Sequence, residues 1–163
     1  MKEGKAIEYL GGWVLSNLEE SVHLTVVKRV AVAKLSVYEI RRIIEDTRAQ
    51  RLGAINIAFD IYEKALLAAI LYNCESWTCL SKKTIKVLDD FFHFFCRVIF
   101  RVPVSCPIAN FYFESATMTF SNLILQRKLN FAFHLSNLEE GSLAKSVWEE
   151  QVMQKDLPGQ RLC

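Results

Sequence analysis

The amino-acid sequence predicts a mainly α-helical bundle with a short β-hairpin at its N-terminus. Apolar residues recur at helical spacing through most of the 163 residues, a length sufficient for one domain with a sizeable core. A Gly-Gly pair stands between two short runs of strand-forming residues near the start. The stretch Leu66–Trp77 begins as a helix too apolar to face water, so other segments are expected to surround it.

The predicted hairpin runs from Lys5 to Leu15 and turns at Gly11 and Gly12. Glycine supplies the positive φ that tight hairpin turns need. A two-stranded hairpin is not stable alone in water. We therefore expect this one to lie against a sheet or against the face of a helix.

A long helix is predicted from Ser21 to about Gln50, because apolar positions there alternate at spacings of four and three. These apolar positions are Val26, Val30, Ala33, Val37, Ile40 and Ile44. The same helix carries the cations Lys28, Arg29, Lys34, Arg41, Arg42 and Arg48. Glu45 and Asp46 follow two of them by one turn, so part of this charge is expected to be paired. The remainder is either a solvated face or a row of cations that meets phosphates.

A second, more apolar helix is predicted from Ala54 to about Trp77. Small residues at positions 65, 68 and 69 leave room for neighbouring helices to approach it closely. Because almost no side of its central part is polar, we expect burial on nearly every side. Trp77, with a large ring and one donor, is expected to be largely buried.

Further helices follow in the second half of the chain. Ser81 is a good N-cap for a helix that reaches about Val102 and carries a broad apolar face with four phenylalanines between 91 and 95. This helix adds the cations Lys82, Lys83, Arg97 and Arg101. Two prolines then mark a break, at positions 103 and 107. Beyond the break we expect helices at Ile108–Ser115, Thr119–Ser136 and Leu143–Lys155.

Composition limits the classes of partner. The formal net charge of +2 argues against a strong, freely acting nucleic-acid binder and leaves room for a local basic face. Hydrophobic residues make up 52% of the chain, and such a surplus usually indicates a missing partner or a missing neighbouring domain. The longest uncharged run, Ala65–Cys74, is too short to span a bilayer, and we expect neither a membrane partner nor a signal peptide.

No residue is assigned a catalytic or metal-binding role. The chain lacks the common phosphate-loop, dinucleotide, zinc-protease and nucleophile-elbow motifs. Asp89 and Asp90 are adjacent on a helix and point about 100° apart, so we interpret them as surface residues. His93 and Cys96 lack a second ligand pair, so His93 is expected at the edge of the core. The five cysteines are expected to be reduced, mostly buried thiols of an intracellular protein, and no cofactor is expected.

Several motifs resemble non-LTR retrotransposon reverse transcriptases. Leu71–Trp77 resembles the L-L-[YN]-[GN]-[CS]-E-[TS]-W signature that follows the polymerase core in that family. The tripeptide Tyr9-Leu10-Gly11 resembles the hairpin in the position of the family's primer grip, and Thr25–Arg48 resembles the first thumb helix. Three later segments resemble the region beyond the thumb: Ser105–Ile108, Lys128–Leu135 and Leu143–Lys145. The motifs occur in the family's order over nearly the whole chain.

The resemblance implies a non-catalytic fragment of an RNA-directed DNA polymerase. Residues 1–17 would be the palm edge, residues 18–103 the thumb-like helical bundle and residues 104–163 the linker beyond the thumb. The family's catalytic F/Y-x-D-D turn precedes the hairpin and is not in this sequence, and the second strand departs from the family at Val14–Leu18. A thumb would contact the backbone of an RNA or DNA template-primer weakly and without sequence preference, through the cations named above. The resemblance also implies a missing palm as partner and a nuclear location.

A different class of function fits the composition as well. The surplus apolar surface is typical of a helical protein–protein interaction module with no nucleic-acid role. The seven-residue spacing of Lys34, Arg41 and Arg48 favours the thumb. A small metal enzyme is a third reading, and it lacks the ligands.

Overall fold

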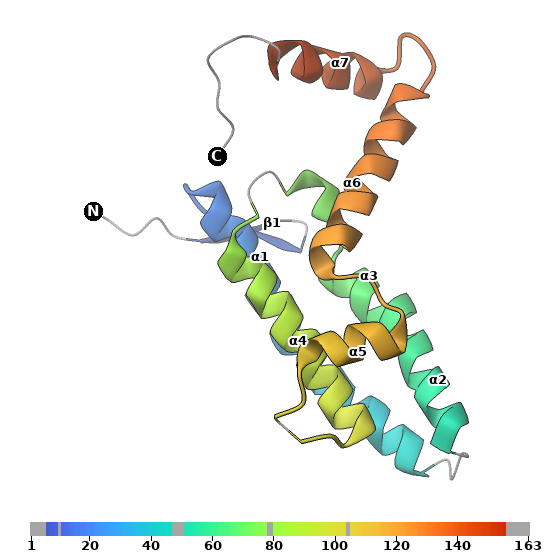
Figure 1. The fold of residues 1–163 in the computed structure, drawn as a ribbon. Helices are drawn as coiled ribbons and strands as arrows, with labels where there is room; N and C mark the ends of the chain where they lie inside the picture. The colour runs from blue at the N-terminus through green and yellow to red at the C-terminus, as the bar shows by residue number, and fades with distance from the viewer. Residues whose placement is uncertain (1–5, 10, 47–50, 78–79, 104, 156–163) are drawn as a thin grey trace.

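The computed structural model of the chain describes residues 6–9, 11–46, 51–77, 80–103 and 105–155. The predicted architecture, mainly helical with an N-terminal antiparallel hairpin, is confirmed (Figure 1). The hairpin and the first part of the chain comprise β1 (Ile7–Tyr9), β2 (Gly12–Val14), α1 (Leu18–Asp46), α2 (Arg51–Ile61) and α3 (Leu67–Ile70). The second part comprises α4 (Lys82–Phe100), α5 (Ile108–Ser115), α6 (Phe120–Ser136) and α7 (Leu143–Lys155).

Helices α1 and α4 run side by side in the same direction. At one end, Nδ1 of His23 lies 3.1 Å from Oγ1 of Thr84. At the other end, Nη2 of Arg101 donates to Oε1 of Glu45 at 2.5 Å. The segment from α2 to α3 returns along them in the opposite direction (Figure 1). These elements form the bundle, which we define as residues 18–100.

The apolar stripe predicted on α1 forms one wall of the core. Its members Val26, Val30, Ala33, Val37 and Ile40 are all buried. Aromatic rings of the returning segment and of α4 fill the interior: Tyr62, Phe91, Phe92 and Phe95. The ring centroids of Tyr62 and Phe95 are 4.6 Å apart in a stacked arrangement. Close aromatic packing of this kind adds to the free energy gained from apolar burial.

The central apolar helix differs from the prediction in shape. It widens into a π turn at Tyr62–Leu66, ends as α3 at Ile70, and is followed by a 3₁₀ turn at Cys74–Ser76. Asn73 separates the two with a left-handed backbone (φ 57°), a conformation that asparagine tolerates better than most residues. The helix therefore stops one to two turns before Trp77, where helical geometry was expected.

Burial of this segment is also one-sided, which corrects the expectation of burial on nearly every side. The large residues at 66, 67, 70 and 71 are buried, whereas Ala65, Ala68 and Ala69 face solvent. An alanine side chain exposes little apolar surface, so its contact with water costs little free energy. This uncharged helix therefore does not need neighbouring segments on its alanine face.

Helix α6 covers the end of the central segment. Arg127 donates from Nη1 to the carbonyl of Leu71 at 3.3 Å, and Nζ of Lys128 donates to the carbonyl of Trp77. Trp77 is only 6% exposed, which confirms the predicted burial. These two cations on α6 are therefore engaged with backbone oxygens of the bundle.

The hairpin lies against the first turns of α1. The backbone N–H of Trp13 donates to Oγ1 of Thr25 at 2.8 Å, and that of Leu15 donates to Oγ of Ser21 at 2.8 Å. Gly11 has a φ of 73°, as the predicted turn requires. Helix α1 begins earlier than predicted, because Oδ1 of Asn17 accepts the N–H of Glu19 at 2.9 Å and caps it.

The C-terminal part of α6 and the whole of α7 project away from the bundle (Figure 1). We call residues 129–155 the arm. Its two helices contact each other, and Nζ of Lys145 on α7 donates a 3.1 Å hydrogen bond to the carbonyl of Leu138 in the loop between them. Within the described ranges, no helix is long and apolar enough to cross a membrane.

Candidate nucleic-acid interface

The predicted cations do not share one face of the molecule. Lys28 and Lys34 are six residues apart on α1, which separates them by about 120° around the helix axis. Nζ of Lys28 lies 5.5 Å from the ring centroid of Trp13 on the hairpin side, and Nζ of Lys34 lies 5.4 Å from that of Phe94 on the α4 side. Arg48 lies outside the described residues.

Arg29 is engaged by the backbone of the protein itself. Its Nε and Nη2 donate to the carbonyl of Gly11 at 3.3 and 2.8 Å. Its Nη1 donates to the carbonyls of Ile70 and Tyr72 at 3.2 and 2.6 Å. Burial lowers the pKa of Arg29, but a guanidinium remains charged in proteins. These bonds, which we call the Arg29 clamp, join the hairpin turn to the end of α3 and occupy the donors that a phosphate would need.

Cations from two helices instead lie along the contact between α1 and α4. We define the α1–α4 seam by Lys34, Arg41, Lys83, Arg97 and Arg101. Arg101 and Arg41 both contact Glu45, and Lys83 directly precedes Thr84, whose Oγ1 lies 3.1 Å from Nδ1 of His23 on α1. From Lys83 to Arg101 the seam is about 27 Å long, at about 1.5 Å per residue. This is the span of about eight base pairs of a duplex.

Carboxylates on the seam neutralise only part of its charge. Oε1 of Glu45 accepts from Nε of Arg41 at 2.9 Å and from Arg101 at 2.5 Å. Hydrogen bonds from these arginines lower the pKa of Glu45. Two cations thus share one carboxylate, and among the described residues Lys34 and Lys83 are in no ion pair. Asp90 is seven residues from both Lys83 and Arg97, and so lies on the same ridge of α4.

Arg97 has a donor without an acceptor. Its Nε is buried, and no hydrogen-bond partner for it exists in the part of the chain that the structure describes. Buried polar groups in folded proteins are nearly always hydrogen-bonded. This donor lies one turn before Arg101 on α4, and because it is enclosed by the protein a phosphate could reach only the outer part of the Arg97 side chain, not its Nε.

Two further predicted cations lie away from the seam. Nη2 of Arg42 pairs with Oε2 of Glu39 at 3.3 Å, on the outer side of α1. Lys82 is exposed at the first turn of α4. Surface ion pairs of this kind contribute little stability, so Arg42 can exchange its partner for a phosphate.

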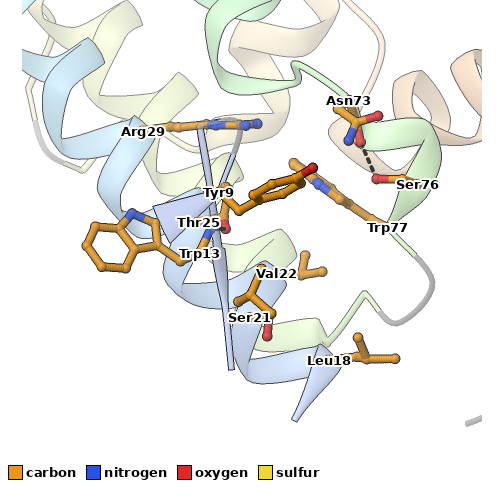
Figure 2. Close-up of a pocket in the computed structure, with 12 residues that line it drawn as sticks. Tyr9, Trp13, Leu18, Ser21, Val22, Thr25, Arg29, Asn73, Ser76 and Trp77 are labelled. Atoms are coloured by element: carbon orange, nitrogen blue, oxygen red, sulfur yellow. Dashed lines mark hydrogen bonds between the residues drawn. The ribbon is translucent and has the colours of Figure 1, made fainter. Parts of the chain in front are cut away.

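The hairpin residues expected in a primer-grip position border a cavity that the sequence did not indicate. Tyr9 is exposed and lines it, Gly11 forms the adjoining turn, and Leu10 lies outside the described residues. The cavity measures about 230 Å³ and lies between the hairpin, the start of α1 and the 3₁₀ turn (Figure 2). Its walls include Tyr9, Trp13, Leu18, Thr25, Asn73 and Trp77. No spacing rule links a hairpin to residues more than 60 positions away, so only the fold reveals the site.

The acidic and metal-ligand candidates have structural roles. Asp89 is half-buried and accepts a 2.8 Å hydrogen bond from the hydroxyl of Tyr112, which corrects its assignment as a surface residue. Asp90 is exposed, as expected. Nε2 of His93 lies 3.0 Å from the carbonyl of Cys106, at the edge of the core. Among the residues searched, no group of histidine, cysteine and carboxylate side chains could hold a metal ion.

The cysteines that the structure describes are unbonded thiols. Cys74 and Cys96 are buried, and Cys106 is half-buried. Burial raises the pKa of Cys96 to about 12, so its thiolate form is negligible near neutral pH. These thiols pack as small apolar groups.

Comparison of the chain with protein-family models, with curated proteins and with solved structures finds no match.

Proposed function

We propose that this chain is a non-catalytic, thumb-type part of a reverse transcriptase, and that its α1–α4 seam contacts the backbone of a template-primer duplex. One observation carries the proposal. Two of the segments that resemble non-LTR reverse transcriptases, Tyr9–Gly11 and Leu71–Trp77, are about 60 residues apart in sequence. The Arg29 clamp joins them, with bonds to Gly11 on one side and to Ile70 and Tyr72 on the other. Two sequence motifs that belong to one functional unit are expected to lie close together in the folded protein, as these two do.

The seam has the chemistry of a weak, sequence-independent contact. Its cations lie on two parallel helices, and Lys34 and Lys83 among them are in no ion pair within the described residues. A net charge of +2 keeps the long-range attraction small. Three or four phosphate contacts correspond to a slope of about −3 in log K against log salt. Binding is therefore expected to be detectable at low salt and to weaken steeply as salt is added.

The parent enzyme in this proposal is an RNA-directed DNA polymerase. Catalysis would belong to a palm outside this chain, which would also cover part of the apolar surface, in a nuclear protein. No residue described above supplies the cluster of carboxylates that holds catalytic metal ions in polymerases. Extension of a primed template by the purified chain with magnesium or manganese would contradict the proposal that catalysis belongs to a palm outside this chain.

A binding titration tests the seam. Fluorescence anisotropy of a labelled RNA–DNA primer-template is followed as the chain is added at low salt, for wild type and for K34Q/K83Q. Loss of two phosphate contacts should flatten the salt slope by about 2. The control is K28Q/K64Q, which removes the same charge from outside the seam. Equal weakening of both variants, or no binding by wild type, would overturn the proposal.

A second candidate is the helical interaction module, with a second copy of this chain as its partner. The observation in its favour is the outer face of α6, which consists of Asn122, Leu125, Gln126, Leu129, Phe133 and Ser136. All six residues are exposed, and none is charged. Two identical faces of this kind meet without like-charge repulsion, and their amides both donate and accept. Sedimentation velocity over a range of concentrations tests it: wild type should dimerise and L129E should not.

A further inference from the structure

We propose that the cavity beneath the hairpin binds one unstacked nucleobase. The inference rests on the proposed nucleic-acid function and adds a ligand class and a second site to it. Engineered apolar cavities of about 150 Å³ hold a benzene ring. A cavity of about 230 Å³ therefore has room for one ring system, with the sugar and phosphate left outside.

The walls of the cavity are aromatic and apolar. Tyr9 and Trp77 project toward one another from the hairpin and from the end of the 3₁₀ turn (Figure 2). Val14, Leu18 and Val22 supply further apolar surface. The ring of Tyr9 is 67% exposed, so nothing in the described chain covers one side of it. Unpaired bases bind proteins mainly by stacking on such rings.

Two neutral polar groups on the wall of the cavity, the indole N–H of Trp77 and the side-chain amide of Asn73, remain available to a ligand. Trp77 is 6% exposed and lines the cavity, and no residue in the described part of the chain accepts a hydrogen bond from its indole Nε1–H. An indole N–H is a donor only, so it can bind an acceptor on a ligand. The side-chain amide of Asn73, also on the wall, offers one acceptor and two donors. The edge of a nucleobase carries acceptors for the indole and a matching pattern for the amide.

Charge on the wall favours a base over a phosphate. Arg29 is the one charged side chain among the lining residues that the structure describes. Its donors are directed to the carbonyls of Gly11, Ile70 and Tyr72. The hydroxyl oxygens of Ser21 and Thr25 already accept the backbone N–H groups of Leu15 and Trp13. The cavity therefore offers an anion no free cation, and a planar neutral ring matches it better.

The test uses the indole N–H resonances of the ¹⁵N-labelled full chain. Adenosine and uridine serve as base probes, ribose 5-phosphate as a phosphate probe, and benzyl alcohol as an apolar ring. Comparison with W77F assigns the Trp77 signal. We expect the nucleosides to shift that signal and the other two probes to leave it in place. No shift with nucleosides, or an equal shift with benzyl alcohol or ribose 5-phosphate, would overturn the nucleobase site.

Matched variants separate stacking from folding. Y9A should weaken nucleoside binding by at least about fivefold, and Y9F, which keeps the ring, should not. Because Tyr9 is exposed, both variants should melt at the wild-type temperature. N73G removes the amide and keeps a residue suited to positive φ, and it should also weaken binding. Wild-type affinity in both Y9A and N73G would overturn the proposal. Duplex binding by the seam is measured separately, so failure of one site does not imply failure of the other.

Discussion

The bundle and the arm are built from similar helices but differ in what covers them. Helix α1 buries a continuous apolar stripe against α4 and the α2–α3 segment. Helix α7 has no buried side chain among those that the structure describes, and Leu143 at its start is exposed. Helical periodicity places both helices correctly, but it does not determine which other element packs on them. Stability should therefore depend on the bundle, while the arm is available for contacts outside the chain.

The largest predicted effect comes from one substitution made in both regions. Phe95 in the bundle is 0% exposed and stacks on Tyr62, whereas Phe133 on the arm is 72% exposed. F95A should lower the free energy of unfolding by about 3–5 kcal/mol. F133A should change it by less than about 0.5 kcal/mol. Urea denaturation measures both, and similar losses in the two variants would contradict the comparison.

The same comparison shows how far the sequence predicts the structure. The first and last residues of α5 and α7 agree with the predicted ones, because Pro107 marks the start of α5 and the loop at 137–142 marks the start of α7. The early end of α3 was missed, because Leu71 and Tyr72 give no signal for a break. Only Asn73, which tolerates positive φ, marks that break.

The candidate sites were less predictable than the fold. Spacing placed Lys34 and Arg41 on one face of α1, but it could not indicate that α4 brings Arg97 and Arg101 beside them. The acceptors of Arg29 lie 18, 41 and 43 positions away, so its structural role has no local signal. Long-range contacts decide which cations remain available to a partner.

An intermediate effect is expected at the Arg29 clamp. R29M keeps the length of the side chain and removes every donor, which leaves the carbonyl of Ile70 without this partner. Hydrogen bonds from a charged group are worth about 1.5–3 kcal/mol, and solvent screening at this half-buried site reduces their sum, so we expect a loss of about 2 kcal/mol. R42M, on the outer side of α1, is the matched control and should cost less than about 0.5 kcal/mol. An unchanged urea midpoint for R29M would show that the hairpin does not depend on the clamp.

The smallest predicted effect is a pH dependence at the contact between α1 and α4. Burial, with a contribution from Lys83, lowers the pKa of His23 below its ordinary value of 6.5. The unfolded chain therefore takes up this proton first, and stability is lost as pH falls from about 6.5 toward the lowered pKa. H23Q should remove that part of the pH profile of the melting temperature. A profile unaltered by H23Q would exclude His23 as its source.

Lysine footprinting tests the central claim that the seam of the bundle, and not the arm, meets a nucleic-acid backbone. The full chain is acetylated with and without a primer-template duplex at low salt, and each lysine is quantified by mass spectrometry. We expect the duplex to protect Lys34 and Lys83 from acetylation and to leave Lys64 and Lys145 modified equally in both samples. Protection confined to Lys145, or no protection of Lys34 and Lys83 at saturating duplex, would contradict it.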